Sequence, residues 1–326
     1  MVNNTGKKRV LIIDGANTFT RSWVLVPQVD REGNPIGGLT GFLKSLQKNI
    51  RETKPDKVVI CWEGSSNSSK RKEMNENYKK GRKAPRLNRE FQMSNPDDER
   101  KNRLYQQFRL IEYLEQMPVI QLALDNQEAD DVIAWVCRES ADFQDYQKVI
   151  VSSDKDFIQL CDQDTILYRP IAKEVLTVPR VLEKHKIHPN NFALARAMIG
   201  DKSDNIDGIK GIGPKTVISK FPFLAEEQSY APEDLVSFAE QTSGKVYQKI
   251  VENKETVMAN YDIMQLYNTN ISLEGMSDLD WAVKNTGSEL NRTTIRSMMI
   301  KDGILNVNIE KMIDTMNGWT QWPQLL

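Results

Sequence analysis

The sequence predicts an α/β fold: a mostly parallel central sheet flanked by helices, followed by a smaller helical region. Short runs rich in Val and Ile alternate with segments of helical period through the first half of the 326 residues. Such alternation is typical of βαβ units, whose strands pair in parallel. From residue 187 the pattern changes, so we expect an α/β core over residues 1–187 and a helical region over 188–326.

The apolar runs place the individual elements. They predict strands over residues 9–14, 57–62, 119–123, 148–153 and 165–168. Helical periodicity predicts helices near 38–53, 99–117, 127–140 and 178–186, and a further helix over 191–200. Because ligands of a parallel sheet bind beyond the carboxyl ends of its strands, residues that follow these strands are candidates for a functional site.

Composition limits the class of protein. Apolar residues make up 39% of the chain, enough to bury a full core, and the net charge is −1. The three cysteines, Cys61, Cys137 and Cys161, form no Cys-x-x-Cys pair, so neither a disulfide framework nor a zinc site is indicated. The apolar run before Asp14 is too short for a signal peptide or a membrane span. These features favour a cytoplasmic protein without a membrane partner.

Clustered acidic side chains are the most informative feature of the chain. Nine of them fall in five short clusters, nearly all directly after an apolar run: Asp14, Glu63, Glu128, Asp130, Asp131, Asp154, Asp156, Asp201 and Asp204. Carboxylates about 4 Å apart repel by roughly 4 kcal/mol at an effective dielectric near 20, so a fold that gathers them needs cations between them. Hard divalent ions such as Mg²⁺ or Mn²⁺ prefer oxygen ligands. The pattern therefore indicates a metal-dependent phosphodiesterase.

The local geometry of the acids can also be predicted. Asp14, Glu63 and Asp154 fall at the carboxyl ends of predicted strands, so we expect them on one rim of the sheet. The acids of residues 128–131 begin a helix, which predicts a cluster of carboxylates on its exposed first turn. Asp154 and Asp156 would share one face if the preceding strand continued through them.

A basic segment separates two of the acidic clusters. Residues 64–90 carry nine Lys or Arg against three Glu, which is nine minus three, or +6. An anionic metal-binding centre beside a basic segment suits a polyanion that is held and cut at one place. A solvated charged loop is the alternative interpretation of this segment.

Residues 198–220 predict a helix–hairpin–helix. Glycines alternate with apolar residues over 206–213, and a helix is expected to begin at Pro214. The turn can present backbone N–H groups to a phosphate, and Lys210 and Lys215 add positive charge. A P-loop is the alternative, but Pro214 interrupts the Gly-Lys step that a P-loop requires.

Together, these motifs resemble the 5′-nuclease family, which includes flap endonucleases, the 5′-exonuclease domain of bacterial DNA polymerase I and bacteriophage 5′-exonucleases, among them a phage ribonuclease H. The motifs, between about residues 9 and 220, are LIIDGAN, VVICWEG, NENYKKGRK, EADDVIA, VSSDKDFIQL and MIGDKSDNIDGIKGIGPKT. The resemblance implies a PIN-like core, a structure-specific 5′-nuclease with exonuclease, flap endonuclease and ribonuclease H activities, and a role in primer removal and flap processing during replication. It also implies the cytoplasm of a bacterium or of a phage-infected host.

The resemblance implies a two-metal site built from the nine acids. Two Mg²⁺ ions, or Mn²⁺ in their place, would activate water and stabilise in-line displacement at phosphorus. The family usually has Asp where this chain has Glu63, and not all relatives carry an acid at Asp131. Both are therefore expected to lie behind the directly binding ligands.

The resemblance further implies that residues 64–90 form an arch over the active site, through which a 5′ single strand passes. Tyr78 would stack on an unpaired base, while Lys79 and Arg82 would hold the scissile phosphate. Other contacts to nucleic acid are expected from Arg71, Lys80, Lys83, Gly208, Lys210, Gly211, Gly213, Lys215 and Thr216. The hairpin would grip duplex phosphates without reading sequence, with K⁺ as a candidate ligand of its carbonyl groups. The implied substrates are branched or nicked DNA and RNA–DNA duplexes with 5′ ends.

Three other functions compete with this interpretation. A silent binding protein of the same fold would have no use for the full acidic set. A phosphotransferase with Asp14 as covalent nucleophile would not need Asp201 and Asp204. A PIN-like ribonuclease for single strands would not need a duplex-binding hairpin. The preference between DNA and RNA primers, and the balance of exonuclease and endonuclease cuts, stay open.

Two features lie outside the family motifs. The last residues, 317–326, are apolar and aromatic, with Trp319 and Trp322. We expect them either to pack back on the helical region or to dock a replication partner such as a sliding clamp or a single-strand-binding protein. His185 and His188 are expected to be ordinary surface residues.

Overall fold

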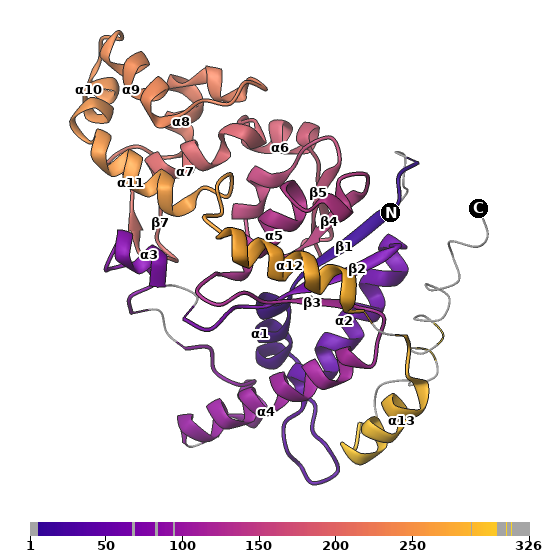
Figure 1. Cartoon of the computed structure of the whole chain (residues 1–326). Helices are drawn as coiled ribbons and strands as arrows, with labels where there is room; N and C mark the ends of the chain where they lie inside the picture. The colour runs from indigo at the N-terminus through magenta and orange to yellow at the C-terminus, as the bar shows by residue number, and fades with distance from the viewer. Residues whose placement is uncertain are drawn as a thin grey trace.

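A six-stranded sheet runs through the centre of the molecule (Figure 1). The computed structural model describes residues 6–66, 69–81, 84–93, 95–287 and 289–304, together with residues 311 and 314. The strands, in the spatial order β3-β2-β1-β4-β5-β6, are β1 (Arg9–Asp14), β2 (Lys57–Cys61), β3 (Ile120–Leu122), β4 (Gln147–Val151), β5 (Thr165–Arg169) and β6 (Glu174–Leu176). The first five strands pair in parallel and only β6 is antiparallel. The predicted fold class is confirmed, although β6 was not predicted.

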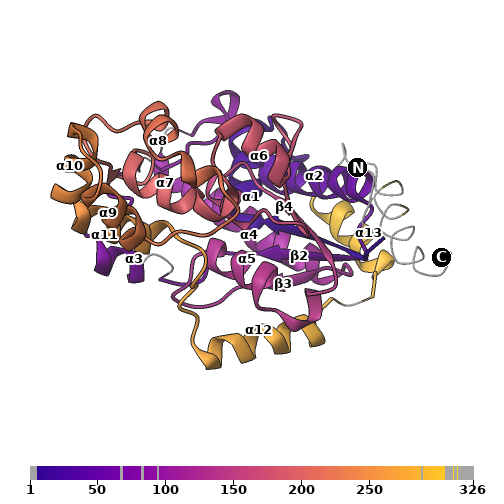
Figure 2. The same ribbon diagram turned by 90° about the horizontal axis from the view of Figure 1, so that it is seen from above.

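Helices cover both faces of the sheet (Figure 2). One face packs against α1 (Gly15–Leu25), α2 (Gly37–Thr53), α4 (Pro96–Glu115) and α13 (Arg292–Lys301), and the other against α5 (Ala129–Arg138) and α12 (Leu273–Asn285). Side chains of β1 alternate between the two cores, because successive residues of a strand point to opposite faces. Leu11 and Ile13 belong to the first core, Val10 and Ile12 to the second.

The helical region continues the second core. It contains α6 (Val178–His185), α7 (Phe192–Ile199), the short pair β7 (Gly200–Asp201) and β8 (Ile206–Asp207), α8 (Pro214–Lys220), α9 (Pro232–Glu240), α10 (Lys245–Glu252) and α11 (Lys254–Met264). The predicted helix–hairpin–helix corresponds to α7, β7–β8 and α8. Met198, Val217 and Val257 belong to the same buried cluster as Val10 and Ile12. The expected boundary at residue 187 therefore crosses a shared apolar core.

Locally, the structure differs from the sequence-based predictions at one helix and one histidine. Helix α1 was not predicted; Asp14, which ends β1, also caps α1 by accepting a hydrogen bond from Asn17 N at 2.9 Å. His188 is only 7% exposed and accepts a hydrogen bond from Asn190 N at Nδ1, so it is not a surface residue. His185 is half-buried. The three cysteines are free and buried.

Two further predictions concern the C-terminal segment and the absence of a membrane span. The apolar segment 317–326 lies outside the described residues, so its predicted packing or docking stays a prediction. Among the described helices, none is long and apolar enough to cross a membrane.

Candidate metal centre

Four acids lie at the carboxyl ends of β1, β2 and β4 and at the start of α5, as the strand pattern predicts. Asp14 ends β1 and accepts a hydrogen bond from Ser152 Oγ at 3.0 Å. Glu63 follows β2 and accepts one from Ala129 N at 3.2 Å, which brings β2 to the first turn of α5. Asp130 lies in that turn, and Asp154 follows β4. We call Asp14, Glu63, Asp130 and Asp154 the sheet group.

Strand β4 ends at Val151, so Asp154 and Asp156 do not share the face of a strand as predicted. Instead Asp156 begins a 3₁₀-helix (Asp156–Leu160), and its N–H donates to Asp154 Oδ1 at 2.9 Å. This tight turn directs Asp156 toward the hairpin of the helical region. The carboxylates of Asp154 and Asp156 therefore lie at two neighbouring positions on the rim.

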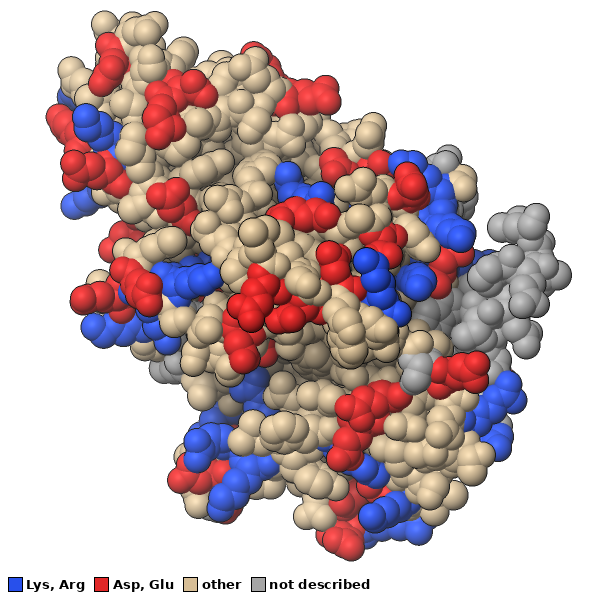
Figure 3. All heavy atoms as spheres, viewed as in Figure 1, with Lys and Arg blue, Asp and Glu red and all other residues tan. Residues whose placement is uncertain are grey.

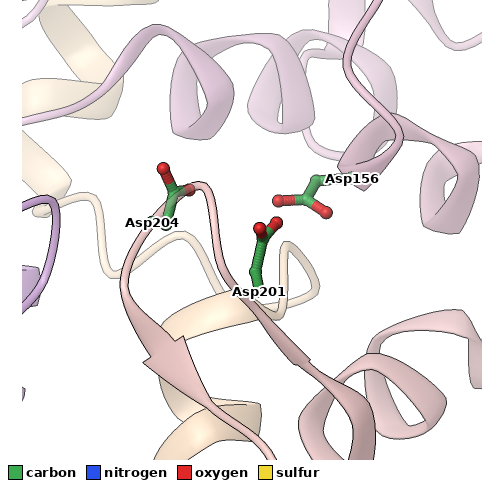
Figure 4. A group of neighbouring side chains, drawn as sticks. All are labelled: Asp156, Asp201 and Asp204. Atoms are coloured by element: carbon green, nitrogen blue, oxygen red, sulfur yellow. The ribbon is translucent and has the colours of Figure 1, made fainter. Parts of the chain in front are cut away.

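A second acidic group forms where the 3₁₀-helix meets the β7–β8 hairpin. Asp156, Asp201 and Asp204 each offer a carboxylate oxygen, and these atoms lie within 4.8 Å of one another. Figure 4 shows Asp201 and Asp204 on the hairpin and Asp156 on the opposite segment, facing Asp201. We call these three residues the hairpin group. Together with Asp130 they line one small pocket.

Sequence reasoning missed Arg196, a basic residue within the hairpin group. It lies on α7, one turn before Asp201, and its Nη2 contacts Asp156 Oδ1 at 3.0 Å and also pairs with Asp201. Its Nε is buried without an acceptor among the described atoms. The i, i+5 spacing of Arg196 and Asp201 gave no signal, because the pairing depends on the turn of the chain at Gly200.

Glu128 and Asp131 are buried, which contradicts the predicted exposed first turn. They are 1% and 6% exposed. Arg71 of α3 (Ser69–Met74) forms a fork on Asp131, with Nη1 and Nη2 at 2.9 and 2.8 Å, and Nη1 also contacts Glu128 at 2.9 Å. The basic segment folds down onto these two acids. Carboxylates can be buried here because guanidinium hydrogen bonds compensate their lost hydration.

Tyr78 and Lys79, which the resemblance places in an arch, both contact Glu128. Tyr78 Oη donates to Glu128 at 3.1 Å and Lys79 Nζ to the other Glu128 oxygen at 2.8 Å. Tyr78 is only 5% exposed, so the implied stacking of its ring on a base does not fit this placement. Lys79, in contrast, keeps its ammonium at the acidic rim, beside Glu128. Arg82 and Lys83 lie outside the described residues.

Other basic side chains lie on the surface of the molecule. In Figure 3 they appear at the left edge, at the position of α3, and around α4. Lys80, Lys210 and Lys215 are exposed, which their predicted contacts to nucleic acid require. Gly211 has φ +85, a conformation that favours glycine. Gly208 is required for packing instead, because a Cβ there would lie 2.1 Å from Ile199 O. Gly213 precedes α8 and Thr216 lies in its first turn.

Burial and neighbouring charges raise the pKa of two acids of the sheet group and of one acid of the hairpin group. Burial, aided by the charges of Glu63 and Asp154, raises the pKa of Asp14 to about 7, against hydrogen bonds from Asn17 and Ser152. Burial and then the charges of Asp154 and Asp14 hold the pKa of Asp130 well above its usual range. Burial and Asp154 also raise the pKa of Asp156 to about 7. The charge of Asp154 thus acts on both groups, and both favour an added cation.

These raised pKa values predict how pH affects the metal-free chain. An Asp whose pKa rises from 3.8 to about 7 on folding holds its proton more tightly when folded. Its contribution to stability is full below about pH 4 and is lost as the pH rises through about 7. Mg²⁺ should therefore raise the melting temperature more at about pH 8 than at about pH 5.5. Thermal unfolding with Mg²⁺ or with a chelator measures this, and equal shifts at both pH values would contradict it.

Comparison with known proteins identifies the family. The sequence profile of the 5′-3′ exonuclease N-terminal, resolvase-like domain matches residues 9–186. The chain belongs to this family. A 5′-3′ exonuclease of Aquifex aeolicus (strain VF5) is 32% identical over 215 residues, which are 65% of this chain and 68% of the relative. DNA polymerase I of Rhizobium leguminosarum is 30% identical over 283 residues, 83% of this chain but only 25% of the polymerase.

Solved structures of the same fold cover almost the whole exonuclease-family chain. The T5 D15 protein, co-crystallised with metal ions, matches 95% of this chain and 100% of its own with a TM-score of 0.63 and 16% identity. The catalytic core of Rad2 in complex with DNA substrate matches 96% of this chain and 93% of its own, with a TM-score of 0.54 and 14% identity. The predicted family, the PIN-like fold and the 5′-nuclease function are confirmed.

Proposed function

We propose that this member of the 5′-3′ exonuclease family is a structure-specific nuclease that depends on two divalent ions. Its substrates would be branched or nicked DNA and RNA–DNA duplexes with 5′ ends, so that it acts as exonuclease, flap endonuclease and ribonuclease H. Mg²⁺ would be the natural metal, with Mn²⁺ able to replace it. The T5 relative's metal ions and the Rad2 core's DNA are consistent with both parts of this proposal.

The convergence of carboxylates from distant segments carries the proposal. Three oxygens of the hairpin group lie within 4.8 Å of one another, and the sheet group adjoins them through Asp154. All these donors are carboxylate oxygens, the donor set that hard divalent ions select. The sheet group and the hairpin group would hold one ion each. Bound ions would supply an activated water and stabilise charge on the reacting phosphate.

The basic residues near the two acidic groups and on the hairpin would then have distinct roles. Lys79 would leave Glu128 for the scissile phosphate, where its ammonium can neutralise developing charge. Burial opposes the charged form of Lys79, but Glu128 and Asp130 outweigh it and raise the pKa, so the ammonium stays protonated. Arg71 already pairs with Asp131 and Glu128 and would anchor the arch rather than bind nucleic acid. Lys210 and Lys215 would hold the duplex.

Cleavage mapping tests the proposed function. A 5′-labelled flap, a nicked duplex and an RNA–DNA hybrid would be incubated with the chain and Mg²⁺, and the product lengths compared. We expect cuts near the junction of the flap and short products from the 5′ ends of the others. Cleavage of an unstructured single strand at scattered positions, or cleavage that persists with a chelator, would contradict the proposal.

A lysine side chain would compete with the K⁺ ion that the resemblance implies for the hairpin. Lys249 of α10 donates from Nζ to Lys210 O at 2.8 Å, so an ammonium already satisfies one carbonyl of the turn. We therefore expect duplex affinity to be similar in K⁺ and in Na⁺ at equal ionic strength. Lys249→Met should make affinity higher in K⁺ than in Na⁺. Fluorescence anisotropy with a labelled duplex measures both, and a marked K⁺ preference of the unmodified chain would argue against this role of Lys249.

A further inference from the structure

One turn of the arch, residues 75–79, contacts both sides of the acidic rim. Toward α5, Tyr78 and Lys79 bind Glu128. Toward the hairpin, Lys79 N donates to Asp204 O at 2.9 Å, and Asn205 Nδ2 donates to Asn77 O at 3.0 Å. The two hairpin contacts join segments that are more than a hundred residues apart in sequence. On the hairpin side they involve Asp204, a member of the hairpin group, and Asn205, the next residue.

Apolar packing reinforces this junction. The buried ring of Tyr78 forms a cluster with Ile206 of β8 and with Ile263 and Met264 at the end of α11. Arg71 adds a hydrogen bond from Nε to Ile263 O at 3.0 Å, and Lys70 adds one from Nζ to Asn270 O at 2.8 Å. The arch is thus seated on the helical region by one buried aromatic ring and several directed hydrogen bonds, which together fix its orientation.

We propose that Asn205 and Tyr78 are positioning residues that couple seating of the arch to the placement of Asp204. The inference rests on the proposed function, because it takes the hairpin group as a cation site. Asp204 lies between β7 and β8, and its backbone carbonyl accepts a hydrogen bond from Lys79 N of the arch. Seating of the arch therefore brings the Asp204 carboxylate toward Asp156 and Asp201.

This coupling works in both directions. If a seated arch places Asp204 for a cation, then a bound cation must favour the seated arch by the same factor. A substrate that unseats the arch would weaken cation binding, and one that seats it would strengthen it. Cation affinity and arch conformation can therefore be measured separately, without any cleavage reaction.

The variant Asn205→Gly tests the coupling. Asn205 has φ +59, which glycine adopts without strain, so the change removes the amide that binds Asn77 and leaves the turn intact. Isothermal titration calorimetry with Mg²⁺ should give an affinity about 2- to 12-fold weaker, the factor that one hydrogen bond supplies. The matched control is Lys202→Ala, an exposed residue of the same turn, which should bind Mg²⁺ like the unmodified chain.

Limited proteolysis supplies the second readout. Mg²⁺ should slow trypsin cleavage within the arch of the unmodified chain and of Lys202→Ala, and should slow it less in Asn205→Gly. Tyr78→Phe keeps the packed ring but loses the bond to Glu128, so it should also lose protection. If Asn205→Gly has a lowered melting temperature, the result for Tyr78→Phe decides whether the coupling exists.

The outcomes separate the inference from the proposed function. If the unmodified chain neither binds Mg²⁺ nor cleaves a flap, the proposed function fails. If it does both, while Asn205→Gly and Tyr78→Phe match it in Mg²⁺ affinity and in protection from trypsin, only the coupling is overturned.

Discussion

Replacing Asp156 by Asn should reduce Mg²⁺-dependent cleavage of a 5′ flap by more than about 10³-fold, beyond the effect of losing one oriented donor. Asp156 faces Asp201 and Asp204, and the charge of Asp154 acts on it, so it is the member of the hairpin group that adjoins the sheet group. The amide removes the charge that a hard cation needs but keeps the size of the side chain. Single-turnover cleavage at several Mg²⁺ concentrations measures the loss.

Flap binding should survive the same change. The hairpin at 206–216, which would grip duplex phosphates, is not altered, and the loss of a negative charge reduces repulsion of the phosphates. Asp201→Asn and Asp204→Asn should bind flaps as well or better, while cleavage falls and needs more Mg²⁺. Asp207→Asn is the matched control, since Asp207 is an exposed acid of β8 outside the hairpin group. Full activity in Asp156→Asn would refute the two-metal interpretation.

Lys79→Ala should slow cleavage by about 10²–10³-fold with almost unchanged duplex affinity, because its ammonium would act on the scissile phosphate in the transition state. In the structure this ammonium already lies at the acidic rim, 2.8 Å from Glu128. The same effect is expected for Arg82→Ala, a residue outside the described part of the chain. Single-turnover rates and flap affinities give the two quantities independently.

A purely structural role of Lys79 would have a different signature. Loss of the Lys79–Glu128 pair alone would lower the melting temperature and the Mg²⁺ affinity, with a small change in the rate at saturating Mg²⁺. Lys72→Ala is the control for charge, since Lys72 is an exposed residue of α3. Normal single-turnover cleavage in both Lys79→Ala and Arg82→Ala would mean that these two residues do not act on the scissile phosphate.

Much of the fold could be predicted because its signals are local. Short β-branched runs predict strands, and β1 was placed over the residues that the structure assigns to it. Parallel pairing then brings the carboxyl ends of β1, β2 and β4 to one rim, so the proximity of Asp14, Glu63 and Asp154 follows from topology. The antiparallel β6 was not predicted because three residues are too few to show a period, and the helix α1 was not predicted either.

The sequence by itself determined the five parallel strands, the acids of the rim and the family, since each depends on residue type and on spacing within one segment. Only the tertiary structure decided which charges meet. Arg71 reaches Asp131 across 60 residues, Asn205 reaches Asn77 across 128, and Tyr78 is buried against Ile206 instead of facing solvent. No local pattern encodes such contacts, because they form only when the packed core has fixed the arch and the hairpin beside each other.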